Sequence, residues 1–459
     1  TWTVTWMQAQ RVFWISGILL VLLWLNRRRL LLNVFQISLL CALVLTVKAS
    51  LQEFEWYSYL PHAFLHPAAL QIQGTVLALF CLGWIALRFV VKGDSWRMLD
   101  SKYSVDRFVM WSLPAAFLLL AMYGALSGVT QELGARGVSY PGFNIADFPH
   151  QEALGVGSWI VLGLLLLTML ASFWQRRSRV YLLGAVVVLT AVMPLIAGQF
   201  ENQGATATAW RCLAAVFLII GSLAIWFRDA ISKRLATFGW PKFDGDAFTT
   251  EARTLLISLV AAPLFLFTII PSLRAIYYLP VQTPVTGFFS LWDDSVLYGF
   301  PLVVAALVMI GYALRERMPR FAFYGGALFN VTVTLAFLLA VVSVRGPMDR
   351  VVLVRLAQLN ILTFAVYSLP WLSTHGRWQA RLNQSGQRLG DYLLKLQLAL
   401  AIALGAVVFL PVTTGLMMFP QRTGARTIAA GSFLGWLAFF AVVVNATWLA
   451  ASKVIRLPA

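Results

Sequence analysis

Charged residues are scarce in this chain, and their scarcity decides its class. Of its 459 residues only 12% are charged and 60% are hydrophobic, and the mean hydropathy is +0.78. A water-soluble fold cannot bury that much apolar surface, whereas the hydrocarbon of a bilayer accepts it. The composition therefore excludes a soluble multidomain protein and predicts a multi-spanning membrane protein.

Metal-ligating residues and catalytic signatures are also few. The chain has 3 cysteines, which lie in or beside apolar runs, and 4 histidines, of which His62 and His66 are set between prolines without a third ligand. It lacks the GxxxxGK[ST], GxGxxG, CxxC, CxxCH and HExxH patterns. These absences disfavour nucleotide-driven enzymes, c-type haem proteins and zincins, and we predict neither a metal site nor a bound cofactor.

Acidic residues are missing from the middle of every apolar run. All 18 lie in connections or close to the end of a run. Ion-coupled transporters usually hold an ionisable or carbonyl-rich site near the membrane midplane, so a carboxylate-driven pump is disfavoured.

What the chain does contain is a series of about 13 apolar segments long enough to span a bilayer. We predict that they form one all-α, multi-pass bundle covering residues 1–459 without a soluble domain. The chain begins with Thr1 instead of Met, which is typical of a processed product or of a portion of a longer protein. The predicted spans are 9–25, 30–48, 68–91, 107–128, 153–174, 179–198, 208–227, 252–273, 294–314, 321–344, 351–372, 390–411 and 427–450.

Basic residues predict the orientation of this bundle. Every second connection is rich in Lys and Arg, so that one side holds 25 of the 35 basic residues and the other side holds 10. By the positive-inside rule the amino terminus faces out and the carboxyl terminus is cytoplasmic, in a bacterial-type inner membrane. The net charge of +17 is thus a topology signal, and we expect no nucleic-acid partner.

Two outer connections, 53–67 and 276–294, are rich in aromatic residues and are expected to lie along the membrane interface. The largest cytoplasmic connection, 228–253, is expected to form a short amphipathic lid.

The outer connection 130–159 gathers the strongest candidates for chemistry. Asp147, His150 and Glu152 lie where this connection enters the fifth predicted span, and we expect His150 in the first turn of that helix. A neighbouring carboxylate can orient a histidine and raise its pKa, which makes His150 a candidate general base tuned by Asp147 and Glu152. The structural alternative is a solvated helix-entry cap.

A second candidate group is basic. Arg350 and Arg355 lie near the outward turn before the eleventh span, Gln358 follows three residues later on the same helical face, and Arg274 occupies a similar depth at the end of the eighth span. Arginine can grip phosphate at two points, so these residues are candidates for binding a lipid-linked phosphate. The alternative is snorkelling to phospholipid head groups or pairing with a nearby aspartate.

The block from Pro149 to Leu154 resembles the Pro-His-Asn segment of the O-antigen ligases and polymerases. In that family the histidine enters a helix and acts with outward-facing arginines on a polyprenyl-pyrophosphate donor. This chain departs from the family at Gln151, which takes the place of the asparagine, and in its shorter preceding loop and larger number of following spans. Separately, Glu53 and Glu55 are similar to the acidic pair of multi-spanning GT-C glycosyltransferases.

These features support the hypothesis of an outward-facing enzyme that transfers a lipid-linked glycan. The expected partners are membrane lipids and a polyprenyl-linked substrate. Two alternatives stay open at this point: a non-catalytic subunit that contacts other membrane subunits, and a facilitative transporter or flippase.

The predicted orientation can be tested by cysteine labelling. In a cysteine-free background, cysteines at Ser58, Ser139 and Thr283 should react with an impermeant thiol reagent in whole cells, whereas cysteines at Ser232 and Thr374 should react only after lysis. The opposite labelling pattern would invert the topology.

Overall fold

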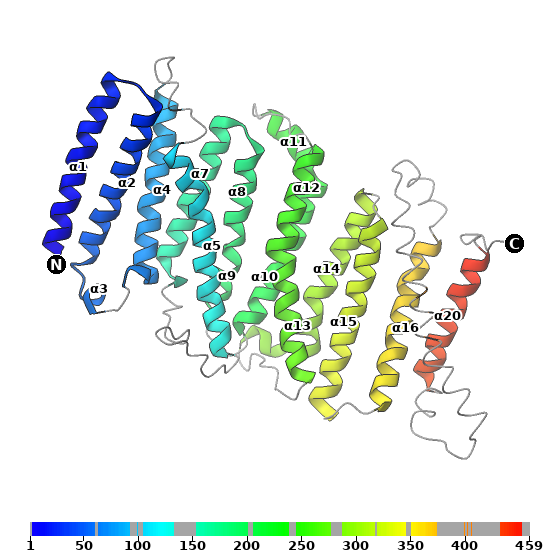
Figure 1. Cartoon of the computed structure of the whole chain (residues 1–459). Helices are drawn as coiled ribbons and strands as arrows, with labels where there is room; N and C mark the ends of the chain where they lie inside the picture. Colours follow the sequence, from blue (N-terminus) through cyan, green and yellow to red (C-terminus); the bar gives the residue numbers. More distant parts are fainter. Residues whose placement is uncertain are drawn as a thin grey trace. The chain divides into compact units, whose positions relative to one another are not determined.

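The computed structural model describes the residues 2–59, 63–91, 99, 104–132, 153–200, 205–237, 245–276, 287–316, 319–345, 350–373, 399, 402, 405 and 432–451. Every regular element among these residues is a helix, as predicted (Figure 1). Eleven of the helices are long and apolar enough to cross a membrane, and they coincide with the first eleven predicted spans. Of the remaining two, 390–411 falls outside the described residues apart from isolated positions. The other corresponds to α20 (Phe433–Ala451), whose apolar part is shorter.

The chain forms two compact units, with their boundaries inside α10 and at the end of α12. Unit 1 comprises Thr1–Trp210 and Phe227–Leu255, and unit 2 comprises Arg211–Trp226 and Leu256–Ala459. The helices of unit 1 are α1 (Trp2–Leu25), α2 (Arg29–Leu51), α3 (Glu55–Tyr59), η1 (Ala63–Leu65), α4 (Pro67–Val90), α5 (Val105–Glu132), α7 (Val156–Arg176), α8 (Arg179–Thr190), α9 (Val192–Ala197), α11 (Arg228–Thr237) and α12 (Gly245–Leu256). Besides most of α10 (Ala205–Trp226), unit 2 contains η4 (Ile257–Ala261), α13 (Ala262–Ile276), η5 (Phe288–Leu291), α14 (Asp294–Glu316), α15 (Pro319–Arg345), α16 (Arg350–Ser373) and α20.

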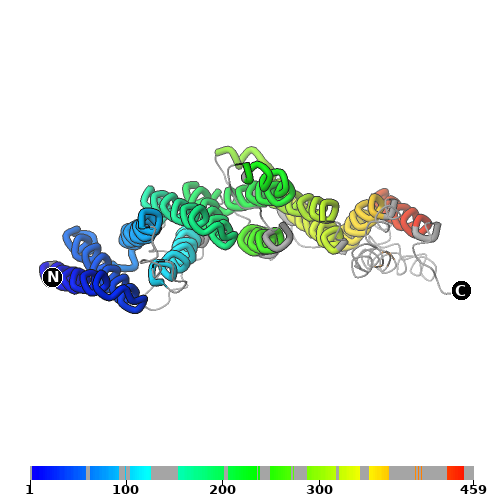
Figure 2. Tube along the Cα trace, turned by 90° about the horizontal axis from the view of Figure 1, so that it is seen from above, coloured from blue at the N-terminus to red at the C-terminus, as the bar shows by residue number. Residues whose placement is uncertain are grey.

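The first helix is longer than predicted. α1 begins at Trp2 instead of residue 9 and runs through Arg11, whose side chain is exposed. A single arginine does not end a helix, because its backbone hydrogen bonds are unaffected and its long stem can carry the charge along the surface. α1 packs along α2, and the two lie side by side in Figures 1 and 2.

The core of unit 1 is built by α2, α4, α5, α7 and α8. Trp84 on α4 makes edge contacts with Phe35 on α2 and with Phe80 on its own helix. Trp111 on α5 stacks on Tyr181 of α8, with ring centroids 5.5 Å apart. Because hydrocarbon offers no hydrophobic drive between helices, close packing of such side chains holds the unit together.

In unit 2, polar side chains join neighbouring helices. The Tyr367 hydroxyl on α16 donates to the Ala322 carbonyl on α15 at 2.6 Å. Asn445 on α20 donates to the Ala365 carbonyl on α16 at 3.0 Å. Hydrogen bonds of this kind between membrane helices are typically worth roughly 1 kcal/mol.

Aromatic residues are exposed in both outer connections that we expect at the interface. In unit 1, Phe54 precedes the short helix α3, Phe64 lies within η1, and each is about half exposed. The ring centroids of Trp56 and His66 are 4.7 Å apart. In unit 2, η5 leaves Phe288 and Leu291 exposed. Their placement in the membrane interface stays a prediction.

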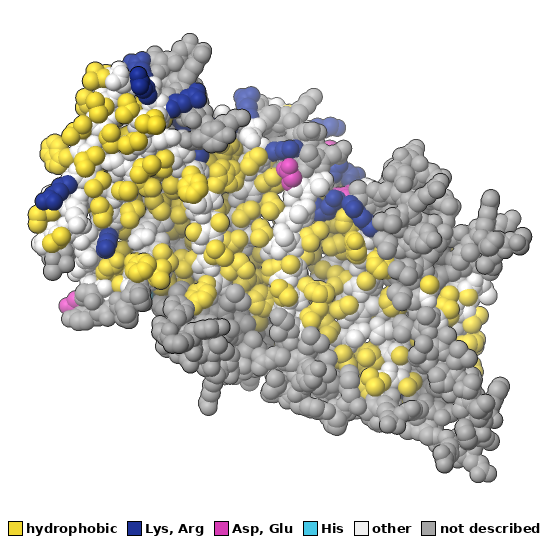
Figure 3. All heavy atoms as spheres, viewed as in Figure 1, with side chains coloured by type: hydrophobic (Ala, Val, Ile, Leu, Met, Phe, Trp, Pro, Cys, Tyr) yellow, Lys and Arg dark blue, Asp and Glu magenta, His cyan; other side chains and the backbone are white. Residues whose placement is uncertain are grey.

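Most of the basic side chains visible on one face of unit 1 lie at the same end of its helices. Figure 3 shows hydrophobic side chains over the middle of this unit and most Lys and Arg side chains at its upper end. The positive-inside interpretation requires this separation of charge.

Two glycines on α7 provide a packing test. A methyl group added at Gly157 would collide with the Gln71 side chain of α4, whereas one added at Gly163 would meet no atom within 4 Å. We expect Gly157→Ala to lower the free energy of unfolding by about 1–3 kcal/mol through overpacking. Gly163→Ala, the matched control, should be neutral or slightly stabilising in thermal unfolding in detergent. Equal effects of the two substitutions would contradict the α4–α7 packing.

Candidate functional site

The three residues predicted to catalyse, Asp147, His150 and Glu152, lie outside the described residues. Their proximity and roles stay predictions. The helix α7 begins at Val156, after an extended Gly155, which is three residues later than the predicted start of the fifth span. Glycine is a poor helix former, which explains the later start.

The predicted phosphate-binding residues are described in part. Arg274 lies in the last turn of α13 and Arg350 is the first residue of α16, but their side chains lie outside the described part of the structure. Arg355 and Gln358, also on α16, are described completely.

Arg355 is exposed, and it forms no hydrogen bond or ion pair with any residue that the structure describes. It lies five residues after the start of α16, which corresponds to about 8 Å along the helix axis. Side chains of a helix lean toward its amino terminus, which is the predicted outer end of α16. The guanidinium can therefore reach the level of lipid phosphates.

Gln358 has a different environment. It is fully buried, one turn deeper than Arg355. Nearby on the same helix, the Asn360 side chain accepts a hydrogen bond from the Thr334 hydroxyl of α15 at 3.0 Å. Arg355 is thus the member of the predicted pair that an external ligand can reach.

A buried arginine in unit 2 was missed by the sequence interpretation. Arg211 on α10 is 1% exposed, its guanidinium carbon lies 3.7 Å from the centre of the Tyr298 ring, and its Nη1 donates to the Phe267 carbonyl at 3.4 Å. It lies six residues after Ala205, or about 9 Å into the helix. An ionised group inside a membrane bundle is a functional candidate by default.

The sequence did contain a signal for Arg211. It lies within the apolar run 208–227 and was counted with the charges of the outer side, although no turn residue separates it from the span. A cation inside an apolar run needs a partner that faces the interior of the bundle.

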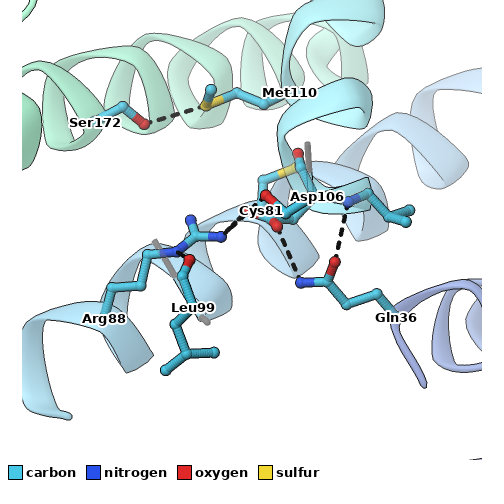
Figure 4. Close-up of polar contacts among 9 residues, drawn as sticks. Gln36, Cys81, Arg88, Leu99, Asp106, Met110 and Ser172 are labelled. Carbon is cyan, nitrogen blue, oxygen red and sulfur yellow. Dashed lines mark hydrogen bonds and ion pairs between the residues drawn. The ribbon is translucent and has the colours of Figure 1, made fainter. Parts of the chain in front are cut away.

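Unit 1 contains a buried ion pair near the end of α4 (Figure 4). Nη2 of Arg88 donates to Oδ2 of Asp106, on the first turn of α5, at 2.6 Å, and both side chains are 4% exposed. Nε2 of Gln36 on α2 donates to the other carboxylate oxygen at 2.9 Å. Nε of Arg88 donates to the Leu99 carbonyl at 2.9 Å.

Gln36 forms a second hydrogen bond to the start of α5. Oε1 of Gln36 accepts the Val105 backbone amide at 3.0 Å, which satisfies one of the free N–H groups at the start of α5. Asp106 also lies at the positive end of the α5 dipole. We call Gln36, Arg88 and Asp106 the ionic clamp, because it connects α2, α4 and α5 through side chains that are already paired.

The described residues include no group of three or more His, Cys, Asp or Glu side chains that could hold a metal ion. No protein-family model, characterised protein or solved structure matches the chain. The chain is a multi-pass membrane protein on the evidence of its apolar helices.

The ionic clamp predicts a non-additive mutational effect. Asp106→Asn leaves a buried guanidinium without its counter-charge, and Arg88→Met leaves a buried carboxylate; each should cost about 3–5 kcal/mol of unfolding free energy. The double variant removes both charges and should cost less than either single variant. Additive losses in thermal unfolding would show that the pair contributes no coupling.

Proposed function

We propose that this multi-pass membrane protein binds a polyprenyl-linked glycan at its outward face and transfers the glycan to an acceptor. The observation that carries the proposal is the exposed guanidinium of Arg355 on α16, which has no partner among the described residues. A charge at this depth is stabilised by an anion at the interface, and a phosphate or pyrophosphate matches the planar donor pattern of arginine.

In this proposal the energy for transfer comes from the donor. His150 takes the proton of the acceptor hydroxyl while Asp147 and Glu152 tune its basicity. The acceptor oxygen forms a bond to the anomeric carbon, and the bond from that carbon to the pyrophosphate oxygen breaks. The leaving polyprenyl pyrophosphate keeps the electron pair, and Arg355, Arg350 and Arg274 stabilise its charge. No bound nucleotide is required.

A non-catalytic role in a larger membrane complex is the second candidate, and α1 favours it. Only 17% of the residues in its most apolar stretch are buried, and it exposes large side chains such as Trp14 and Trp24. Other membrane subunits would cover these side chains, whereas in the enzyme they face lipid. The exposed α1 surface does not explain Arg355, so we rank this role second.

The proposal predicts a selective effect of Arg355. The full chain is reconstituted in nanodiscs that contain excess phosphatidylglycerol, and binding of a polyprenyl pyrophosphate is measured. Arg355→Gln should weaken binding roughly tenfold, which corresponds to one charge-assisted interaction. Arg355→Lys should weaken it less, because a point charge replaces a planar fork.

Arg11→Gln is the matched control, because Arg11 is an exposed arginine on the same predicted side of the membrane. This variant should bind like the parent protein. His150→Ala should abolish glycan transfer and leave binding intact. If the parent protein does not bind polyprenyl pyrophosphate above the level of the phospholipid, the enzyme proposal fails and the scaffold becomes the leading candidate.

A further inference from the structure

A second arginine beside the ionic clamp is buried, and two of its guanidinium nitrogens are left without a hydrogen bond. Arg107 lies in the first turn of α5 and is 6% exposed, and neither its Nε nor its Nη2 has a hydrogen-bond partner. A guanidinium stays protonated in proteins, and a buried charge is costly unless it is paired. The geometry of this turn therefore requires an acceptor for Arg107.

The adjacent carboxylate of Asp106 does not accept a hydrogen bond from these two nitrogens. Asp106 already accepts Arg88 on one oxygen and Gln36 on the other. The backbone carbonyl of Ser104, which begins this turn, accepts the amides of Arg107 and Phe108 at 3.1 and 3.3 Å. Two buried arginines, Arg88 and Arg107, thus lie near one described carboxylate, which is bonded to Arg88, and the positive end of the α5 dipole adds to their field. Among the side chains that the structure describes at this turn, the excess of positive charge favours an anion as the ligand.

Apolar side chains next to Arg107 indicate what carries the anion. Phe108 is 75% exposed, and Trp111, four residues after Arg107 on the same helical face, is 39% exposed. Both lie deeper along α5 than Arg107, so a lipid whose acyl chain covers them has its phosphate at the level of the first turn. One phospholipid offers a group for each of these features: its phosphate can bind the cation, and its acyl chains can cover the exposed aromatic rings.

We infer that the first turn of α5 binds an anionic phospholipid, whose phosphate accepts hydrogen bonds from Arg107 and whose acyl chain lies on Phe108 and Trp111. The α5 amino terminus belongs to the basic side of the bundle, which is predicted to be cytoplasmic, and anionic lipids are abundant in that leaflet. A zwitterionic lipid is a poorer ligand, because its ammonium group would approach Arg88 and Arg107. This binding site is independent of the proposed outward glycan site.

The test compares lipids on the purified full chain in uncharged detergent. Titrated phosphatidylglycerol should raise the midpoint of thermal unfolding more than phosphatidylcholine does. In Arg107→Gln the concentration for half of this effect should rise roughly tenfold, because one charge-assisted contact is lost. Arg107→Lys, which keeps the charge, should lose less.

The control is Arg28→Gln, which removes an exposed arginine from the same predicted side of the membrane and should leave the titration unchanged. Without added lipid, Arg107→Gln should unfold at a temperature no lower than the parent protein, because it removes an unpaired charge. A clear loss of stability in that condition would reveal an internal partner and overturn the inference.

Two further results would also overturn it. If Arg28→Gln and Arg107→Gln weakened the stabilisation by phosphatidylglycerol equally, the effect would depend on the net charge of the protein and not on a site at Arg107. Equal stabilisation by millimolar inorganic phosphate would assign the site to a soluble anion instead of a lipid. Native mass spectrometry should count one fewer tightly bound phosphatidylglycerol in Arg107→Gln than in the parent protein.

Discussion

A charge that enters hydrocarbon must find a partner or reach the interface, and this constraint governs the arrangement of both units. A lone buried ion costs several kcal/mol, more than most single packing contacts contribute. In unit 1 the constraint is met by the ionic clamp. Arg88 and Asp106 neutralise each other, and each forms a further hydrogen bond, to the Leu99 carbonyl and the Gln36 side chain respectively. In unit 2 it is met at Arg211 by an aromatic ring and a backbone carbonyl. The remaining spans meet it by containing few charges.

The same constraint explains why the spans could be predicted from the sequence. A helix in lipid satisfies its own backbone, so an apolar run of sufficient length has one available conformation. Eleven predicted spans therefore coincide with helices. The predicted ends of the spans were less accurate than their positions, because helix ends depend on local features that hydropathy does not measure. The prediction omitted residues 2–8 of α1, and Gly155 delayed the start of α7.

Side-chain partners could not be predicted in the same way. Gln36 and Asp106 are 70 residues apart, and their hydrogen bond depends on how α2 and α5 pack. By sequence, Asp106 falls in a basic connection and Arg88 at the end of a span. In the structure Asp106 lies in the first turn of α5, and neither sequence position reveals the pair. Arg211 was assigned to the outer surface for the same reason. Packing decides whether a charge near a helix end faces solvent or its neighbours.

The partners of an arginine indicate its role. Arg88 is bonded to a carboxylate, so its charge is neutralised and its role is structural. The ring and carbonyl beside Arg211 stabilise its charge without cancelling it, which leaves a positive field inside unit 2. Arg107 is buried with two nitrogens unbonded, and Arg355 is exposed without a partner in the described chain. No described side chain neutralises the charge of either of the last two, which is why ligand binding is proposed at them and not at the clamp. They lie in different units on oppositely predicted sides of the membrane, so each proposal stands or fails without the other.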